Sequence, residues 1–111
     1  MCYNQAGQLQ EATLYLHEVI WKDRFIAKII DKHGVTVEEV EGVLFSKPHV
    51  RRVEKGHIAG EDMYVAYGQT ETGRYLAVFF IHKRRAAALP ISARDMTLSE
   101  RRYYESQKKT R

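Results

Sequence analysis

The sequence has little of the chemistry that builds disulfide scaffolds or metal centres. It contains a single cysteine, Cys2, among 111 residues. One thiol cannot form an internal disulfide framework or a cysteine-built zinc site, and it fits a reducing compartment. The five histidines are scattered, at positions 17, 33, 49, 57 and 82, and no pair has the spacing of a helical zinc motif. We therefore expect no metal and no cofactor.

Long apolar runs are also missing. The two longest, Tyr75 to Ile81 and Ala86 to Ile91, fall far short of the roughly 20 residues that a membrane helix needs. Residues 1–13 have neither a basic start nor an apolar run, so we expect no signal peptide and no membrane contact. The chain has neither a glycine-rich phosphate loop nor a Gly-x-Ser-x-Gly elbow, so nucleotide-cofactor enzymes and serine hydrolases lack support.

Charge is distributed unevenly along the chain. Residues 1–82 hold 9 basic and 11 acidic side chains, whereas residues 83–111 hold 9 basic and 3 acidic, a net charge of +6. The basic end also contains Tyr103 and Tyr104. Cations with nearby aromatic rings suit a nucleic-acid backbone and its bases. A solvated helix with one charged face would give the same pattern, so both interpretations stay open.

Hydrophobic spacing divides the chain into a loose N-terminal extension, residues 1–13, and a single domain, residues 14–111. Leu14 to Trp21 alternates as a strand does. The spacing then becomes helical, with the apolar stripe Phe25, Ile26, Ile29 and Ile30. Gly34 is expected to end this helix in a left-handed cap.

A second helix is predicted after Thr36, which forms a capping box with Glu39, and it ends before Pro48. Four further strands follow, at residues 49–53, 62–69, 74–82 and 86–93. Gly73 allows a tight hairpin between the second and third of these. Pro90 cannot donate a ladder hydrogen bond, so the last strand is expected to lie at an edge or to be bulged there.

A final helix begins at a second capping box, formed by Thr97 and Glu100. The order of elements is strand, two helices, four strands and one helix. This order predicts an α+β fold in which an antiparallel meander sheet has its helices packed on one face.

Two places along the chain carry candidate chemistry. Lys32 and His33 lie at the end of the first predicted helix, where histidine titrates near neutrality. The alternative is that both side chains only complement the helix dipole. Arg94 ends the last strand and offers a rigid fork of donors that suits a phosphate. The alternative for Arg94 is a salt bridge to Glu100 or Asp95.

Cleavage of RNA through its 2′-hydroxyl requires a base, an acid and a cation near the phosphate, and amino-acid side chains can supply all three without a metal. The final helix adds cations and an aromatic ring to this set, as Arg101, Arg102 and Tyr104. Arg84 and Arg85 form a basic turn before the last strand. These residues are therefore candidates for binding RNA.

Several short motifs resemble a known family when they are taken in order. They are Lys32-His33-Gly34-Val35, Glu38-Glu39-Val40-Glu41 with Val43-Leu44-Phe45 and Pro48, Gly68-Gln69-Thr70, Gly73-Arg74-Tyr75-Leu76, and Ile91-Ser92-Ala93-Arg94-Asp95-Met96-Thr97 followed by Glu100-Arg101-Arg102 and Tyr104. The family is that of the BrnT-type toxins, the ribonuclease half of bacterial BrnT–BrnA toxin–antitoxin pairs. The resemblance extends from about Val19 to Glu105.

The resemblance implies a RelE-like α+β ribonuclease fold, a cytoplasmic location and no cofactor. It also implies RNA cleavage that arrests growth, and neutralisation by a cognate BrnA-like antitoxin. Contact with DNA would occur only indirectly, through the antitoxin that represses the operon.

The resemblance further suggests roles for individual residues. Lys32 and Arg94 would bear the phosphate charge, His33 would transfer a proton, and Tyr104 would stack on a base or position it. Arg84, Arg85, Arg101 and Arg102 would bind RNA. Glu100, because it belongs to a capping box, is expected to act as a cap rather than as a catalyst.

This chain departs from the family pattern at two places. The Trp-Asp pair that often opens the first helix reads Trp21-Lys22-Asp23, and many relatives carry an arginine where this chain has Leu89. Arg84 or Arg85 would have to replace that charge. The alternative function is therefore a catalytically degenerate member of the fold that binds the antitoxin and regulates the operon, or an RNA-binding module.

Overall fold

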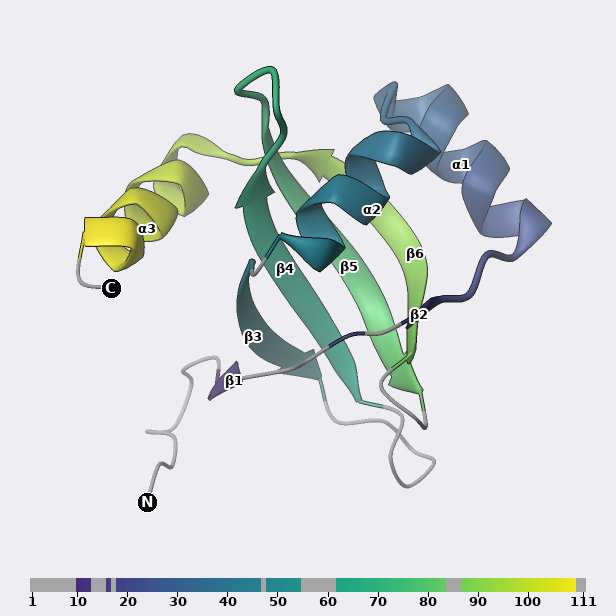
Figure 1. Ribbon diagram of the computed structural model, residues 1–111, viewed down its shortest axis with the longest axis horizontal. Helices are drawn as coiled ribbons and strands as arrows, with labels where there is room; N and C mark the ends of the chain where they lie inside the picture. The colour runs from purple at the N-terminus through teal and green to yellow at the C-terminus, as the bar shows by residue number, and fades with distance from the viewer. Residues whose placement is uncertain are drawn as a thin grey trace.

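The structure is a computed structural model that describes residues 10–12, 16, 18–46, 48–54, 62–83 and 87–109 (Figure 1). The strands in this part of the chain are β1 (Gln10–Ala12), β2 (Glu18–Val19), β3 (His49–Glu54), β4 (Met63–Gln69), β5 (Tyr75–Lys83) and β6 (Ala87–Asp95). The helices are α1 (Asp23–His33), α2 (Val37–Phe45) and α3 (Leu98–Lys109). The α+β class predicted from the sequence is confirmed. Residues 10–12 of the predicted N-terminal extension form β1, and the domain limits stay a prediction.

The strands form one mixed sheet in the order β1-β3-β4-β5-β6-β2. Neighbouring strands from β3 to β6 run antiparallel, as a meander does, and β1 joins β3 antiparallel. The predicted all-antiparallel sheet is nevertheless wrong, because β2 pairs parallel with β6. The chain leaves β2 at one edge of the sheet and crosses through α1 and α2 before it re-enters as β3. Since α1, α2 and three strands separate β2 from β6 along the chain, no hairpin forces the two strands to be antiparallel, and the alternation of residues along a strand does not reveal its direction.

The predicted helix ends are observed. Gly34 lies in the left-handed region with φ of 62°, and backbone N–H groups at this cap donate to the carbonyls of Ile29 and Ile30. The capping box of Thr36 and Glu39 is complete at the start of α2. At the start of α3, the Thr97 N–H donates to Glu100 Oε1 at 2.8 Å. Among the described residues, no helix is long and apolar enough to cross a membrane.

The sheet is covered on both faces, contrary to the prediction that the helices share one face. Helices α1 and α2 lie over one side, which we call the α1/α2 face, and α3 packs on the other, the α3 face. Buried residues on the α1/α2 side are Ile29, Val35, Val40, Val43, Leu44, Val50, Ala66, Leu76, Val78, Phe80, Ala88 and Ala93. Those on the α3 side are Val65, Tyr67, Ala77, Met96 and Tyr104. Since β4 and β5 carry apolar side chains on both faces, each face needs a cover.

Strand β6 contains the bulge that Pro90 suggested. Phe79 pairs with Ser92, whereas the next residue, Phe80, pairs with Pro90, so Ile91 is the extra residue. A bulge reverses the side-chain alternation from that point onward. Leu89 and Arg94, which a regular strand would direct to opposite sides, therefore both belong to the α3 face.

Candidate active site on the α3 face

Arg94 is held on the α3 face by its neighbour on α3. Its guanidinium donates to both carboxylate oxygens of Glu100, at 2.7 and 2.9 Å. These hydrogen bonds hold the pKa of Glu100 below its ordinary value. The guanidinium carbon lies 5.2 Å from the centre of the Phe79 ring, and 33% of the Arg94 side chain is exposed. The salt bridge to Glu100 that the sequence offered as an alternative is therefore present, but this bridge leaves Arg94 accessible at the surface.

A second group of polar side chains lies beside Arg94 on the same face. The Nε2 atom of His49, on β3, lies 2.6 Å from the hydroxyl of Tyr103 on α3, and the two rings meet edge to face. The guanidinium carbon of Arg51 lies 4.2 Å from the centre of the Tyr103 ring. Tyr67 of β4 is the strand partner of His49 and contacts Tyr103 edge to face. Side chains from two strands, β3 and β4, thus converge on Tyr103 of α3.

The pKa of Tyr67 depends on residues from both groups, the one around Arg94 and the one around Tyr103. Burial raises the pKa of the Tyr67 phenol, Glu100 raises it further, and Arg51 and Arg94 oppose that rise. Tyr67 therefore lies within the field of both arginines. We call the combined set the α3-face cluster. Its members are His49, Arg51, Tyr67, Arg94, Glu100 and Tyr103.

Arg51 has hydrogen-bonding capacity that the fold does not use. Its Nε atom is buried and has no hydrogen-bond partner in the described part of the chain. A buried donor without an acceptor costs about 1–3 kcal/mol, and more for a charged group. Arg51 and Arg94 both act on the pKa of Tyr67, so two guanidinium charges lie close to one phenol on the α3 face. The α3-face cluster is therefore suited to binding an anion.

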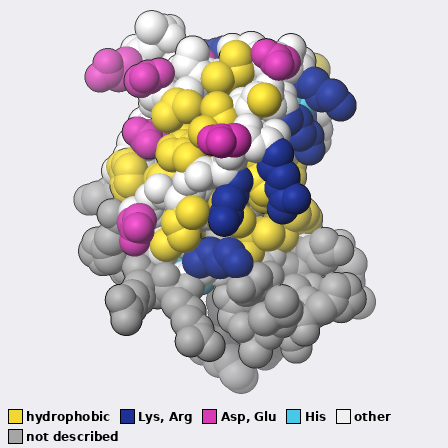
Figure 2. All heavy atoms as spheres, turned by 90° about the vertical axis from the view of Figure 1, so that its right-hand side faces the viewer, with side chains coloured by type: hydrophobic (Ala, Val, Ile, Leu, Met, Phe, Trp, Pro, Cys, Tyr) yellow, Lys and Arg dark blue, Asp and Glu magenta, His cyan; other side chains and the backbone are white. Residues whose placement is uncertain are grey.

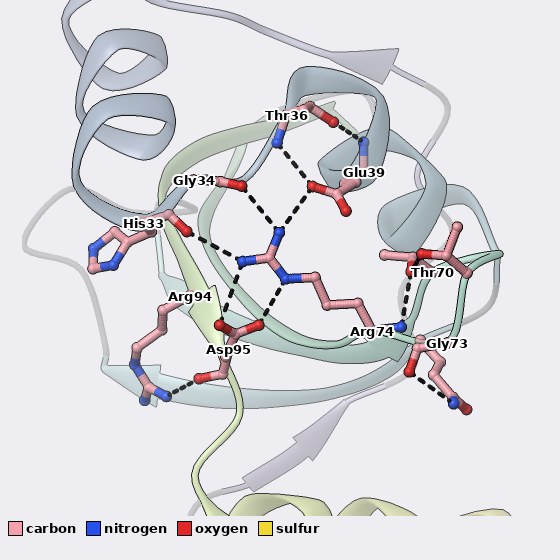
Figure 3. A network of polar contacts seen from close by, with 11 residues as sticks. His33, Gly34, Thr36, Glu39, Thr70, Gly73, Arg74, Arg94 and Asp95 are labelled. Atoms are coloured by element: carbon pink, nitrogen blue, oxygen red, sulfur yellow. Dashed lines mark hydrogen bonds and ion pairs between the residues drawn. The ribbon is translucent and has the colours of Figure 1, made fainter.

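Lys32 and His33 lie in the last turn of α1, and the His33 backbone belongs to a network of polar contacts organised by Arg74 (Figure 3). The Arg74 guanidinium donates to the backbone carbonyls of His33 and Gly34, to Glu39, and to both carboxylate oxygens of Asp95. These hydrogen bonds tie the α1–α2 turn to β5 and β6, and the bond from Arg74 lowers the pKa of Asp95. Arg74 is thus a structural clamp for this end of the sheet.

His33 and Arg94 both lie beside Asp95, whose backbone carbonyl accepts a hydrogen bond from Arg94 at 3.1 Å. The Lys32 side chain is exposed and that of His33 is half-buried. In Figure 3 the His33 imidazole points away from the Arg94 guanidinium. No hydrogen bond or ion pair between described residues joins either side chain to the α3-face cluster. Their predicted catalytic roles stay predictions.

The other predicted site residues are distributed over α3 and its surroundings. Tyr104 is only 8% exposed and packs edge to face on Tyr75. Arg101 and Arg102 are exposed on α3, and the Arg101 guanidinium carbon lies 4.2 Å from the centre of the Tyr75 ring. Arg84 and Arg85 lie outside the described residues. On the side of the molecule where α1 and β6 lie in Figure 1, and not α3, lysine and arginine side chains form an oblique band with apolar side chains between them (Figure 2).

Leu89 occupies an informative position. The bulge brings it to the α3 face, where it is 7% exposed and pairs with Ile81. Arg94 pairs with Ala77, four residues away along β5. At about 3.3 Å per residue, this separates the two positions by about 13 Å along the sheet. Because the bulge puts both positions on the α3 face, an arginine side chain at position 89 would share that face with Arg94.

Sequence reasoning missed four members of the α3-face cluster: His49, Arg51, Tyr67 and Tyr103. A signal for two of them was available. His49 and Arg51 are two residues apart in a strand, so their side chains share one face. Their proximity to Tyr103 depends on which face α3 covers, and this does not follow from local spacing.

Fold and cluster together define a small α+β protein with a cationic, aromatic sheet face that is suited to a phosphodiester. Among the described residues, no three histidine, cysteine or acidic side chains gather as a metal site would require. The family model for the BrnT ribonuclease toxin of type II toxin–antitoxin systems matches residues 21–100, and the chain belongs to this family. Membership implies a cognate antitoxin. No curated protein matches the chain.

Proposed function

We propose that this protein cleaves RNA on its α3 face without a metal ion, that cleavage arrests growth, and that a BrnA-like antitoxin neutralises it. Membership of a ribonuclease toxin family supports the reaction class. The antiparallel meander from β3 to β6 supports a RelE-like fold, as the resemblance implies. DNA is contacted only through the antitoxin.

The observation that carries this proposal is the convergence of two guanidinium groups with a histidine and two tyrosines on one sheet face. Arginine keeps its charge at any working pH and matches phosphate oxygens with paired donors. Arg51 and Arg94 stabilise the charge that develops on the phosphate during cleavage. The exposed Arg101 and Arg102 extend the cationic surface along α3 toward flanking nucleotides.

Metal independence follows from the chemistry of the available donors. Mg²⁺ binds carboxylate and water oxygens in such sites. The only carboxylate in the cluster, Glu100, accepts two hydrogen bonds from Arg94 and one from the Thr97 backbone. It is therefore already neutralised, and the positive charge beside it comes from arginine.

The test uses purified protein, a short RNA and a chelator. We expect cleavage in the presence of EDTA and none of a DNA strand with the same sequence, because the attacking 2′-hydroxyl is absent. Arg94→Ala should lower kcat/KM by roughly 100-fold to 1,000-fold, the loss typical of one deleted donor to a developing oxyanion.

Arg24→Ala is the matched control, because Arg24 is an exposed arginine on α1 that packs on Phe25, outside the cluster. Circular dichroism checks that both variants are folded. Cleavage that requires added Mg²⁺, or a folded Arg94→Ala variant with normal cleavage, contradicts the proposal.

One observation favours a second candidate, a degenerate toxin that binds its antitoxin without cleaving RNA. The side chain at position 89 is a nearly buried leucine, and Arg94 is neutralised by Glu100. In that case induced expression would leave growth unchanged, while the protein would still bind the antitoxin.

A further inference from the structure

We propose that His49 and Tyr103 are the proton-transfer pair of the α3 face, a role that the sequence suggested for His33. This inference rests on the proposed RNA cleavage and assigns the groups that remove the proton of the 2′-hydroxyl. It follows from the contact that joins β3 to α3 within the cluster.

The geometry of the pair is that of two groups able to exchange a proton. His49 Nε2 and the Tyr103 hydroxyl oxygen are 2.6 Å apart, a short hydrogen bond for a nitrogen and an oxygen. A base that is oriented by a second hydrogen-bonding group is a recurring feature of catalytic sites. The edge-to-face packing of the two rings fixes their relative orientation.

The surroundings of the pair place it where a phosphate would bind. Arg51 follows His49 by two residues on β3, and its guanidinium lies over the Tyr103 ring. Tyr67 faces the pair from β4. Arg51 thus puts a guanidinium charge directly against the Tyr103 ring, so a phosphate bound to this guanidinium would lie beside the pair.

The proposed step conserves all atoms and charges. The RNA 2′-hydroxyl gives its proton to the Tyr103 oxygen while the Tyr103 hydroxyl proton passes to His49 Nε2 across their hydrogen bond. The 2′-oxygen bonds to phosphorus, the bond from phosphorus to the 5′-oxygen breaks, and this oxygen takes a proton from water. The hydroxide that remains takes the proton from His49. The products are a 2′,3′-cyclic phosphate and a 5′-hydroxyl, and the pair returns to its starting state.

His33 occupies a different environment. Its carbonyl accepts a hydrogen bond from the Arg74 clamp, and its side chain lies close enough to Asp95 to help lower the pKa of that carboxyl. Asp95 belongs to the clamp and not to the α3-face cluster. His33 thus lies beside the Arg74 clamp, whereas His49 contacts Tyr103, over whose ring the Arg51 guanidinium lies.

The experiment compares pH–rate profiles of RNA cleavage for the wild-type protein, His49→Gln and Tyr103→Phe. We expect His49→Gln to lower kcat by roughly 100-fold to 10,000-fold and to remove the acid limb of the profile, because a glutamine cannot accept the proton. Tyr103→Phe keeps the ring beneath Arg51, so it should lower kcat while binding of an uncleavable 2′-deoxy RNA stays unchanged.

His82→Gln is the matched control, since His82 packs on Tyr64 of the α1/α2 face and has no place in the reaction. A His49→Gln protein with a wild-type profile overturns the inference, as does loss of the acid limb in His33→Gln alone. If Arg94→Ala abolishes cleavage and His49→Gln does not, only the proton assignment fails. If the wild-type protein cleaves no RNA, the proposed function fails as well.

Discussion

The two faces of the sheet are built differently, although the same strands supply both. The α1/α2 face is apolar and closely packed. A side chain at Gly68 would bring its Cβ to 2.9 Å from Val43 Cγ1, so α2 rests directly on the β4 backbone. On the α3 face, Tyr104 is the only buried side chain among residues 98–108 of α3.

Polar contacts supply much of the attachment on that second face. Arg94 binds Glu100, the Tyr75 hydroxyl donates to Glu105, and Lys108 donates to Gln69. One face therefore provides a rigid apolar frame, and the other holds charged and titratable groups in position at the surface. The comparison teaches that stability and chemistry are separated across a single sheet.

Two neighbouring phenylalanines give the most stringent test of the difference between the two faces. Phe80 points into the α1/α2 core and is fully buried, whereas Phe79 is half-buried on the α3 face beneath Arg94. Phe80→Ala should lower the free energy of unfolding by about 3–5 kcal/mol. Phe79→Ala should cost less stability but lower RNA cleavage, because Arg94 loses its support.

Urea denaturation measures the first effect, and cleavage by folded protein measures the second. The two variants remove the same atoms from adjacent residues, so each serves as the control for the other. Equal losses of stability would mean that the two faces contribute alike, and the comparison would then be wrong.

Local chemistry was readable from the sequence. Gly34 takes positive φ, Gly73 takes positive φ in the hairpin, and both threonine capping boxes form. Each of these features depends on residues within four positions of one another. The bulge at Pro90 belongs to the same category, because proline itself lacks the N–H that the ladder needs.

Contacts between distant elements were not readable in this way. The parallel pairing of β2, the face covered by α3 and the meeting of His49 with Tyr103 all join segments far apart in the chain. Alternation in β5 showed apolar residues on both sides but not which helix covers each side. The candidate site was therefore found only in part: Arg94 came from its motif, while its partners from β3 and β4 required the fold.

A substitution at position 89 should have a smaller effect on cleavage, and it tests whether an added cation on the α3 face binds RNA. Leu89→Arg places a cation on the α3 face, on the same side as Arg94 because of the bulge. We expect cleavage to rise by roughly tenfold, which corresponds to one phosphate contact of about 1.4 kcal/mol. Since Leu89 is nearly buried, the arginine must extend its charged end toward the surface, and some stability is lost.

Cleavage rate and melting temperature are measured on the same sample of Leu89→Arg. Leu89→Met, which conserves volume without adding charge, is the control and should leave both nearly unchanged. Unfolded Leu89→Arg protein would show that position 89 belongs to the core rather than to the site. Unchanged cleavage with unchanged stability would show that a leucine in place of the arginine found in many relatives has no consequence for cleavage by this protein.

The smallest expected effect concerns the ion pair that attaches α3. Hydrogen bonds from Arg94 hold the pKa of Glu100 below its ordinary value of 4.5. Because the pKa is lowered in the folded protein, this contribution to stability is complete above the unfolded pKa. It is lost as the pH falls through the lower, folded pKa. Both side chains are partly exposed, so the pair contributes only about 0.2–1 kcal/mol.

Glu100→Gln removes the charge but keeps an oxygen that can accept the Thr97 N–H bond of the capping box. The variant should therefore be slightly less stable than the wild type at neutral pH, and the difference should vanish in acid, below the folded pKa of Glu100. Unfolding in urea at a series of pH values measures this convergence. Glu38→Gln, an exposed position in the first turn of α2, controls for general charge effects. A difference that persists unchanged in acid would show that the charge of Glu100 does not attach α3, and that this helix is held by the packing of Tyr104 and by its other polar contacts.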